Sequence, residues 1–135
     1  MTALGALRRQ REATLSRARS ALDAAQRVCE RAEERHLQSA RLLAAEGAAP
    51  ATGQPLAVAQ EAVRQTRLTR LRARVRADGI AATEARIQKD AAVAAVAEAL
   101  RGLRAVDVLE QRAARVEQDR RRRRDAAETE DRNRR

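Results

Sequence analysis

The sequence predicts an all-α fold: a long antiparallel two-helix coiled-coil hairpin with an overhanging C-terminal helix. Three observations predict it. Both prolines and two of the five glycines fall within Glu46–Pro55, and these residue types end helices. On either side, apolar residues recur at alternating steps of three and four, the spacing of a coiled-coil seam. The chain has no Phe, Trp or Tyr, so it lacks the large side chains that stabilise a compact core.

The first predicted helix, arm one, runs from about residue 3 to residue 46 and carries one continuous seam. The seam residues are Leu15, Ala18, Leu22, Ala25, Cys29, Ala32, His36, Ser39 and Leu43. Leu4 and Leu7 extend it less regularly towards the N-terminus. Arg, Glu, Gln and Ser fill most other positions, which suits a solvent-facing surface.

Residues 47–54 form the predicted bend, and arm two runs from about residue 55 to residue 132. Pro55 suits the first helical position. The residues predicted for the arm-two seam are Leu68, Leu71, Val75, Ile80, Ile87, Ala94, Val93, Val96, Leu100 and Leu103. After a three-residue shift, a stammer, the predicted seam resumes with Val106, Leu109, Ala113 and Val116. The whole chain, 1–135, is then a single helical hairpin.

Gly79 leaves an alternative open, because a glycine inside a helix costs about 1 kcal/mol relative to alanine. A break there would give three helices.

If the arms pair from the bend, arm one is used up near Glu98, and about thirty residues of arm two project beyond it. Acid-before-base pairs four residues apart, such as Glu117–Arg121, support a lone helix there.

The net charge of +10 is spread along the whole chain. An even spread favours a positively charged rod that meets acidic protein surfaces or nucleic acid. Arg120–Arg124 is the densest basic run, but Glu117, Asp119, Asp125 and Glu128 bracket it, and no aromatic side chain could stack on bases. This pattern favours an ion-paired helix end over nucleic-acid contact.

No pattern of catalytic, cofactor-binding or metal-binding residues is present, and the sequence predicts that the protein is not an enzyme. Cys29 and His36 lie seven residues apart on one helix face, but two ligands without a third do not make a zinc site. A single cysteine excludes an internal disulfide and fits a reducing cytoplasm. No signal-peptide pattern and no run of about 18 apolar residues occurs. We therefore expect a cytoplasmic protein without membrane insertion.

Two stretches and the architecture resemble the FliJ/YscO family, the small central-stalk proteins of type III secretion systems. Residues 28–35 read Val-Cys-Glu-Arg-Ala-Glu-Glu-Arg, similar to a Cys-x-x-Ala-Glu-Glu stretch in flagellar members. Residues 109–112, Leu-Glu-Gln-Arg, lead into a highly charged end, as in that family. The short arm, the bend after about fifty residues and the longer second arm are also similar.

The resemblance implies a stalk similar to the coiled-coil part of the γ subunit of rotary ATPases. Such proteins place the end that carries both termini in the pore of the hexameric secretion ATPase. They also contact the cytoplasmic domain of the export gate at the inner membrane, and some bind export chaperones. By position, the ATPase-binding residues would be Arg8, Arg9, Arg11, Leu109, Arg112 and Val116. The gate-binding residues would be Leu42, Leu43, Leu56 and Val63, although family members often have aromatic residues there and this chain has none.

Two other classes of function remain open from the residues alone. One is a basic coiled-coil module that binds nucleic acid without sequence preference. The other is a generic scaffolding coiled coil that dimerises through its Leu and Val seam. Neither requires a small-molecule substrate.

Overall fold

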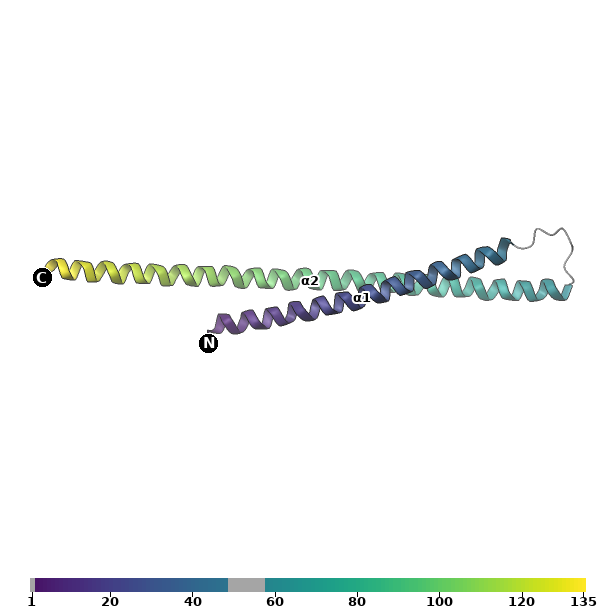
Figure 1. Ribbon diagram of the computed structural model, residues 1–135, viewed down its shortest axis with the longest axis horizontal. Coiled ribbons are helices and arrows are strands. Elements are labelled where there is room, and N and C mark those ends of the chain that lie inside the picture. The colour runs from purple at the N-terminus through teal and green to yellow at the C-terminus, as the bar shows by residue number, and fades with distance from the viewer. Residues whose placement is uncertain (1, 49–57) are drawn as a thin grey trace. The chain divides into compact units, whose positions relative to one another are not determined.

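The computed structural model describes residues 2–48 and 58–135, and it confirms the all-α helical hairpin (Figure 1). Helix α1 spans Ala3–Ala48 and helix α2 spans Val58–Arg134. The two helices pack against each other, and no strand occurs among the described residues. Gly47, assigned to the bend from sequence, is still helical. Ala48, also assigned to the bend, is the last residue of α1, and residues 49–54 and Pro55 lie outside the described residues.

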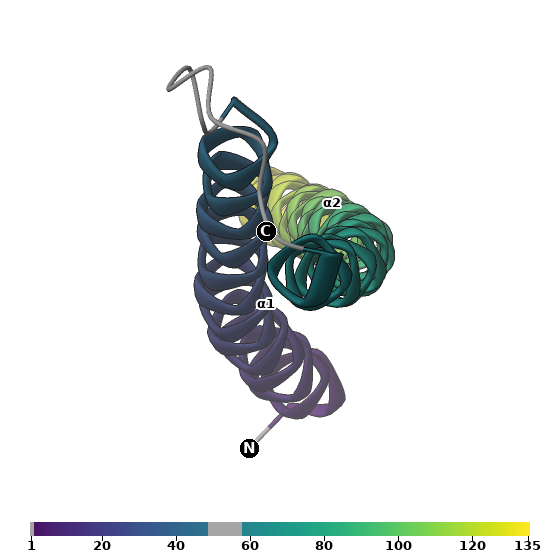
Figure 2. The ribbon, with the colours of Figure 1, turned by 90° about the vertical axis from the view of Figure 1, so that its right-hand side faces the viewer.

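The chain divides into two compact units, each containing a stretch of both helices. The terminal unit combines Met1–Ala18 with Ala95–Arg135, and the middle unit is Arg19–Ala94. Within each unit the stretches of α1 and α2 run in opposite directions (Figures 1 and 2). No described helix is both long and apolar enough to cross a membrane.

The predicted seam of α1 is confirmed. Each of its nine residues is buried or half-buried, and so are Leu4 and Leu7. The deepest are Leu15, Cys29, Ala32 and Ser39, of which Ser39 is only 1 % exposed. The hydroxyl of Ser39 donates a hydrogen bond to the carbonyl oxygen of His36 at 3.1 Å, which satisfies this buried polar group.

The middle unit corrects part of the predicted seam of α2. Leu68, Leu71 and Val75 are buried or half-buried as expected, but Ile80 and Ile87 are 61 % and 63 % exposed. Val93 and Ala94 are exposed as well. The buried positions are instead Ala82 and Ala85, which form one apolar cluster with Cys29 and Ala32 of α1. Small side chains on both helices let the backbones approach closely, and isoleucine at these positions would hold them apart.

In the terminal unit the seam of α2 continues without the predicted stammer. Val96, Ala99, Leu103 and Val106 are buried or half-buried at regular steps, and Glu110 follows at the next step. Leu109, Ala113 and Val116, which were predicted to resume the seam, are exposed. The shift was inferred from Leu and Val positions alone, whereas Ala99 carries the regular spacing through this region.

The pairing also extends further along α2 than the predicted end near Glu98. Arg8 of α1 contacts Glu110, and residues 111–135 are exposed along their whole length. The overhang is real but begins about twelve residues later than pairing directly from the bend would place it. Register in a coiled coil is set by which seam residues interlock, not by the shortest connection.

Gly79 does not break α2, so the three-helix alternative is wrong. The glycine instead makes room for α1, because a Cβ atom added at Gly79 would lie 3.2 Å from Nε2 of His36. The imidazole of His36 therefore occupies the space that a side chain would take. The contact offsets the intrinsic cost of glycine within a helix.

We expect Ala82→Leu to destabilise the protein by about 1–3 kcal/mol, because the added methylenes would separate α1 from α2. Urea unfolding followed by circular dichroism at 222 nm measures the effect. The control is Ala24→Leu at an exposed position of α1, which should change stability by less than about 0.5 kcal/mol. Equal effects of the two substitutions would contradict the close packing of Ala82 against α1.

A double-mutant cycle tests the contact between Gly79 and His36. In a His36→Ala background, Gly79→Ala should stabilise the protein by about 1 kcal/mol, because the helix gains propensity without crowding. In the wild-type background the gain should be smaller, since the new methyl group presses on the imidazole. Equal gains in both backgrounds, measured by thermal unfolding, would show that the two residues do not interact.

Candidate functional site

The candidate site lies in the terminal unit, which contains all six residues assigned to ATPase binding by resemblance. Arg9, Arg11 and Arg112 are exposed, and Leu109 and Val116 are 43 % and 52 % exposed. Arg8 differs from the others because it is half-buried between the helices. Five of the six side chains are thus accessible, and the sixth connects α1 to α2.

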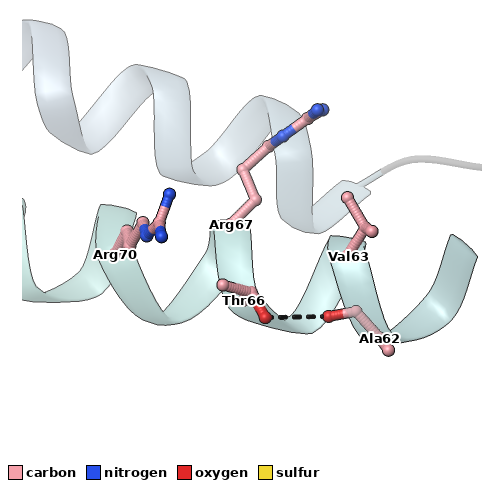
Figure 3. Close-up of a pocket in the computed structure, with 5 residues that line it drawn as sticks. All are labelled: Ala62, Val63, Thr66, Arg67 and Arg70. Atoms are coloured by element: carbon pink, nitrogen blue, oxygen red, sulfur yellow. Dashed lines mark hydrogen bonds between the residues drawn. The ribbon is translucent and has the colours of Figure 1, made fainter. Parts of the chain in front are cut away.

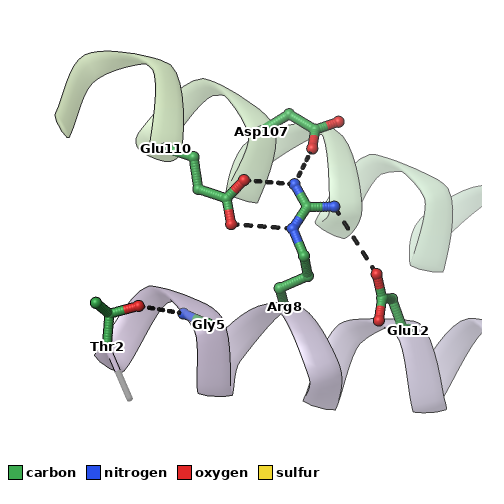
Figure 4. A network of polar contacts seen from close by, with 6 residues as sticks. All are labelled: Thr2, Gly5, Arg8, Glu12, Asp107 and Glu110. Atoms are coloured by element: carbon green, nitrogen blue, oxygen red, sulfur yellow. Dashed lines mark hydrogen bonds and ion pairs between the residues drawn. The ribbon is translucent and has the colours of Figure 1, made fainter. Parts of the chain in front are cut away.

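The start of α1 is fixed by a capping interaction just before this site (Figure 4). The hydroxyl of Thr2 accepts a hydrogen bond from the backbone N–H of Gly5 at 3.1 Å, and the carbonyl oxygen of Thr2 accepts one from the N–H of Ala6. A threonine at this position satisfies a backbone donor that the first helical turn leaves unpaired. Residues 3 to 11 therefore begin as regular helix and present Arg8 towards α2.

Arg8 joins the two helices through a carboxylate cluster (Figure 4). Its Nε and Nη2 atoms donate to the two carboxylate oxygens of Glu110 at 2.9 and 2.6 Å. Nη2 also donates to Asp107, and Nη1 lies 3.8 Å from Glu12 on its own helix. A two-point guanidinium–carboxylate contact fixes orientation as well as distance.

Sequence reasoning missed Asp107 and Glu110. The signal for them was present, because Arg8 and Glu110 occupy seam positions where an apolar residue would be expected. Opposite charges at facing seam positions indicate a contact once the register is known. Without the correct register, no residue of α2 could be matched to Arg8.

The Arg8 contact changes the acid–base behaviour of both partners. The hydrogen bonds from Arg8 lower the pKa of Glu110 below its ordinary value of 4.5. In return, the hydrogen bonds to Glu110 and Asp107 raise the pKa of the Arg8 guanidinium. Both groups therefore stay charged near neutral pH, and the contact persists as an ion pair.

Arg11 lies against α2 one turn further along α1. A Cβ atom added at Gly102 would meet Nη1 of Arg11 at 3.2 Å and its Cδ at 3.4 Å. The glycine lets the aliphatic stem of Arg11 cross the surface of α2, and the residue as a whole stays exposed. Arg11 thus contributes apolar contact to the helix pair and keeps its charge accessible.

Beyond Glu110, α2 continues as an exposed helix. Arg121 and Glu117 form the predicted ion pair at 3.4 Å, and the other residues of Arg120–Arg124 are exposed as well. Leu109, Ala113 and Val116 follow steps of four and three, so they lie along one face of this helix. The segment offers a narrow apolar strip bordered by arginine.

The second predicted surface, for the export gate, lies in the middle unit and is only partly accessible. Leu42 is 49 % and Val63 is 61 % exposed, whereas Leu43 is half-buried in the seam. Leu56 lies outside the described residues. Val63 borders a shallow hollow that is also lined by Ala62, Thr66, Arg67 and Arg70 (Figure 3). Thr66 donates a hydrogen bond to the carbonyl oxygen of Ala62, and Arg67 reaches Glu46 of α1 at 3.4 Å.

Cys29 interacts through its thiol with a carboxylate of its own helix. Its thiol lies 3.7 Å from Glu33, and burial raises the pKa of the thiol. Arg86 donates to Glu33 at 2.9 Å, and this bond lowers the pKa of the Glu33 carboxyl. Within residues 2–48 and 58–135, no three His, Cys, Asp or Glu side chains are grouped as a metal site would need.

We expect Glu110→Gln to destabilise the protein at neutral pH. The folded-state pKa of Glu110 is lowered, so its stabilising contribution is present above the ordinary value of 4.5 and is lost as pH falls through the lowered pKa. Urea midpoints of wild type and variant should differ near pH 7 and converge in acid, once the pH has fallen below the lowered pKa of Glu110. Glu128→Gln in the overhang removes the same charge and should have little effect; a difference at Glu110 that persists in acid would contradict the ion pair.

The terminal unit therefore combines an anchored helix start with an exposed, strongly charged helix that carries apolar side chains on one face. This arrangement can bind a partner through Leu109 and Val116, with the arginines facing acidic side chains. Comparison of the chain with protein-family models, with curated proteins and with solved structures finds no match.

Proposed function

We propose that this protein is a non-enzymatic stalk of a type III secretion system, flagellar or injectisome, which couples the hexameric secretion ATPase to the export gate. One observation carries the proposal: in the unit that contains both termini, α2 continues beyond Glu110, the partner of Arg8, as an exposed, charged helix. The resemblance to the FliJ/YscO family places its members' ATPase contact at that same end.

The geometry suits insertion into a ring. A single helix is only about 10–12 Å across with its side chains, so residues 111–135 are narrow enough to enter a central pore. Exposed ion pairs contribute little each, and contacts of this kind can be exchanged as the surrounding subunits change conformation. A partner with acidic side chains in its pore would attract the segment electrostatically.

The residues of the terminal unit would then have distinct roles. Leu109 and Val116 would pack on apolar side chains of the ATPase, and Arg9, Arg11 and Arg112 would face acidic ones. Arg8 is a positioning residue, because its guanidinium is already engaged by Glu110. It sets where α1 begins relative to the exposed part of α2.

The middle unit would provide the contact with the cytoplasmic domain of the export gate. Leu42 and Val63 are exposed there, and Arg67 and Arg70 adjoin Val63. This surface joins apolar and basic groups, which suits an acidic partner surface. Export chaperones would use exposed parts of the same helices, on the cytoplasmic side of the inner membrane.

The test is binding to, and stimulation of, the type III secretion ATPase of the same organism. We expect Leu109→Asp to weaken binding by about tenfold or more, because a charge would replace an apolar anchor. Leu109 is exposed, so the circular-dichroism spectrum should not change. The matched control is Val28→Asp, at an exposed position of α1 in the middle unit, which should bind and stimulate as wild type does.

Two results would overturn the proposal. One is a wild-type protein that neither binds nor stimulates the ATPase. The other is binding to duplex DNA at near-physiological salt, with a steep salt dependence and no ATPase contact; this would identify a nonspecific nucleic-acid module instead.

A further inference from the structure

Helix α2 carries a second apolar stripe within the middle unit, away from α1. Ile80 and Ile87 are 61 % and 63 % exposed. The alanines that share their spacing, all exposed, are Ala73, Ala77, Ala91 and Ala94. Ile80 is two residues from the buried Ala82, and two residues turn a helix by about 200°. We call these six residues the outer stripe; it lies on the face opposite the seam.

The outer stripe has the spacing of a coiled-coil seam. Its residues follow steps of four and three, and Glu84 occupies the one position of the series that is not apolar. Single exposed apolar residues are normal on a protein surface, but a regular series is the pattern by which helices pair. The middle part of α2 therefore has two seams, of which α1 covers one.

The charges beside the outer stripe divide it into two halves. Arg70 and Arg76 lie towards its N-terminal end, and Glu84 and Asp90 lie towards its C-terminal end. None of these four side chains makes an ion pair or hydrogen bond within the described part of the chain. One half of the stripe is thus basic, the other half is acidic, and both are available to a partner.

We propose that the outer stripe binds a second copy of this chain, with the two α2 helices antiparallel. An antiparallel copy brings the basic half of each stripe against the acidic half of the other, whereas a parallel copy would bring like charges together. A two-fold axis relates the two copies, so the basic half of each stripe lies against the acidic half of the other at both ends of the contact. This self-complementarity is the reason to choose a second copy over an unrelated helix.

The stripe also fixes the register of the pair. Antiparallel seams interlock when Ala77 of one copy faces Ile87 of the other and Ala73 faces Ala91. The same register sets Arg76 beside Asp90 of the second copy, twice across the axis, and brings the two Thr83 residues together on it. Ala77 and Ile87 then pair a small side chain with a large one on each side of the axis, and Ile80 faces Glu84 between them.

A hollow on α2 supports this arrangement. It is lined by Arg76, Gly79, Ile80, Thr83 and Glu84. In the proposed register, Ile80 of the second copy faces Glu84 at the rim of this hollow. The contact lies wholly in the middle unit, so it does not rest on the ATPase contact proposed for the terminal unit.

Sedimentation equilibrium of the full chain, from micromolar to millimolar concentration, tests the association. We expect a monomer–dimer equilibrium. Arg76→Asp and Asp90→Arg should each raise the dissociation constant by about tenfold or more, because two attractive pairs become repulsive. The double variant, with both charges exchanged, should restore dimerisation. Arg31→Asp, at an exposed position of α1, makes the same charge change and should have no effect.

Cross-linking with a short bis-maleimide tests the orientation. In a Cys29→Ala background, Thr83→Cys should cross-link efficiently, since the two copies of this position meet on the axis. Thr69→Cys lies on the same face but should not, because its two copies would be about 42 Å apart in the antiparallel pair. A parallel pair would cross-link at both positions.

Each other result overturns the proposal. A monomer at all concentrations shows that no second copy binds. A dimer that is unaffected by Arg76→Asp uses another face. Equal cross-linking at positions 69 and 83 shows a parallel pair, and loss of dimerisation by both single variants without recovery in the double variant shows that the charges do not meet as proposed.

Discussion

The close approach of α1 and α2 at Cys29, Ala32, Ala82 and Ala85 is the constraint on which the middle unit depends. These side chains contribute little buried area each, so the stabilisation comes from many short van der Waals contacts between the helices. Close approach also explains why His36 needs a glycine opposite it. Because small side chains occupy the face of α2 that packs on α1, the larger apolar residues Ile80 and Ile87 lie on the surface.

In the terminal unit, a polar contact follows the buried apolar residues of the seam. Leu15, Ala99 and Val106 are buried, and Arg8 contacts Glu110 and Asp107. An arginine–carboxylate contact at the edge of a helix pair fixes position more than it adds stability. The exposed segment of α2 begins at residue 111, directly after Glu110.

The sequence contained enough to predict the seam of α1 but only part of the seam of α2. Helix α1 has one apolar stripe, so its heptad spacing has a single solution. Helix α2 has two, and the one with isoleucine gives the stronger periodic signal although the one with alanine is buried. An analysis of hydrophobic periodicity gives most weight to large apolar side chains. In the structure, α1 packs on the face of α2 whose small side chains allow the closest contact. The Arg8–Glu110 contact could not be predicted for the same reason, because matching these two residues requires the register of α1 against α2.

The exposure of residues 111–135 has a thermodynamic consequence. A helix without tertiary packing is held by its own hydrogen bonds and ion pairs, and it opens and closes locally from its end. Its amide hydrogens therefore exchange with solvent independently of global unfolding. A partner that binds this segment as a helix would stabilise the helical form. Binding would therefore slow amide hydrogen exchange, and only in the last turns of α2.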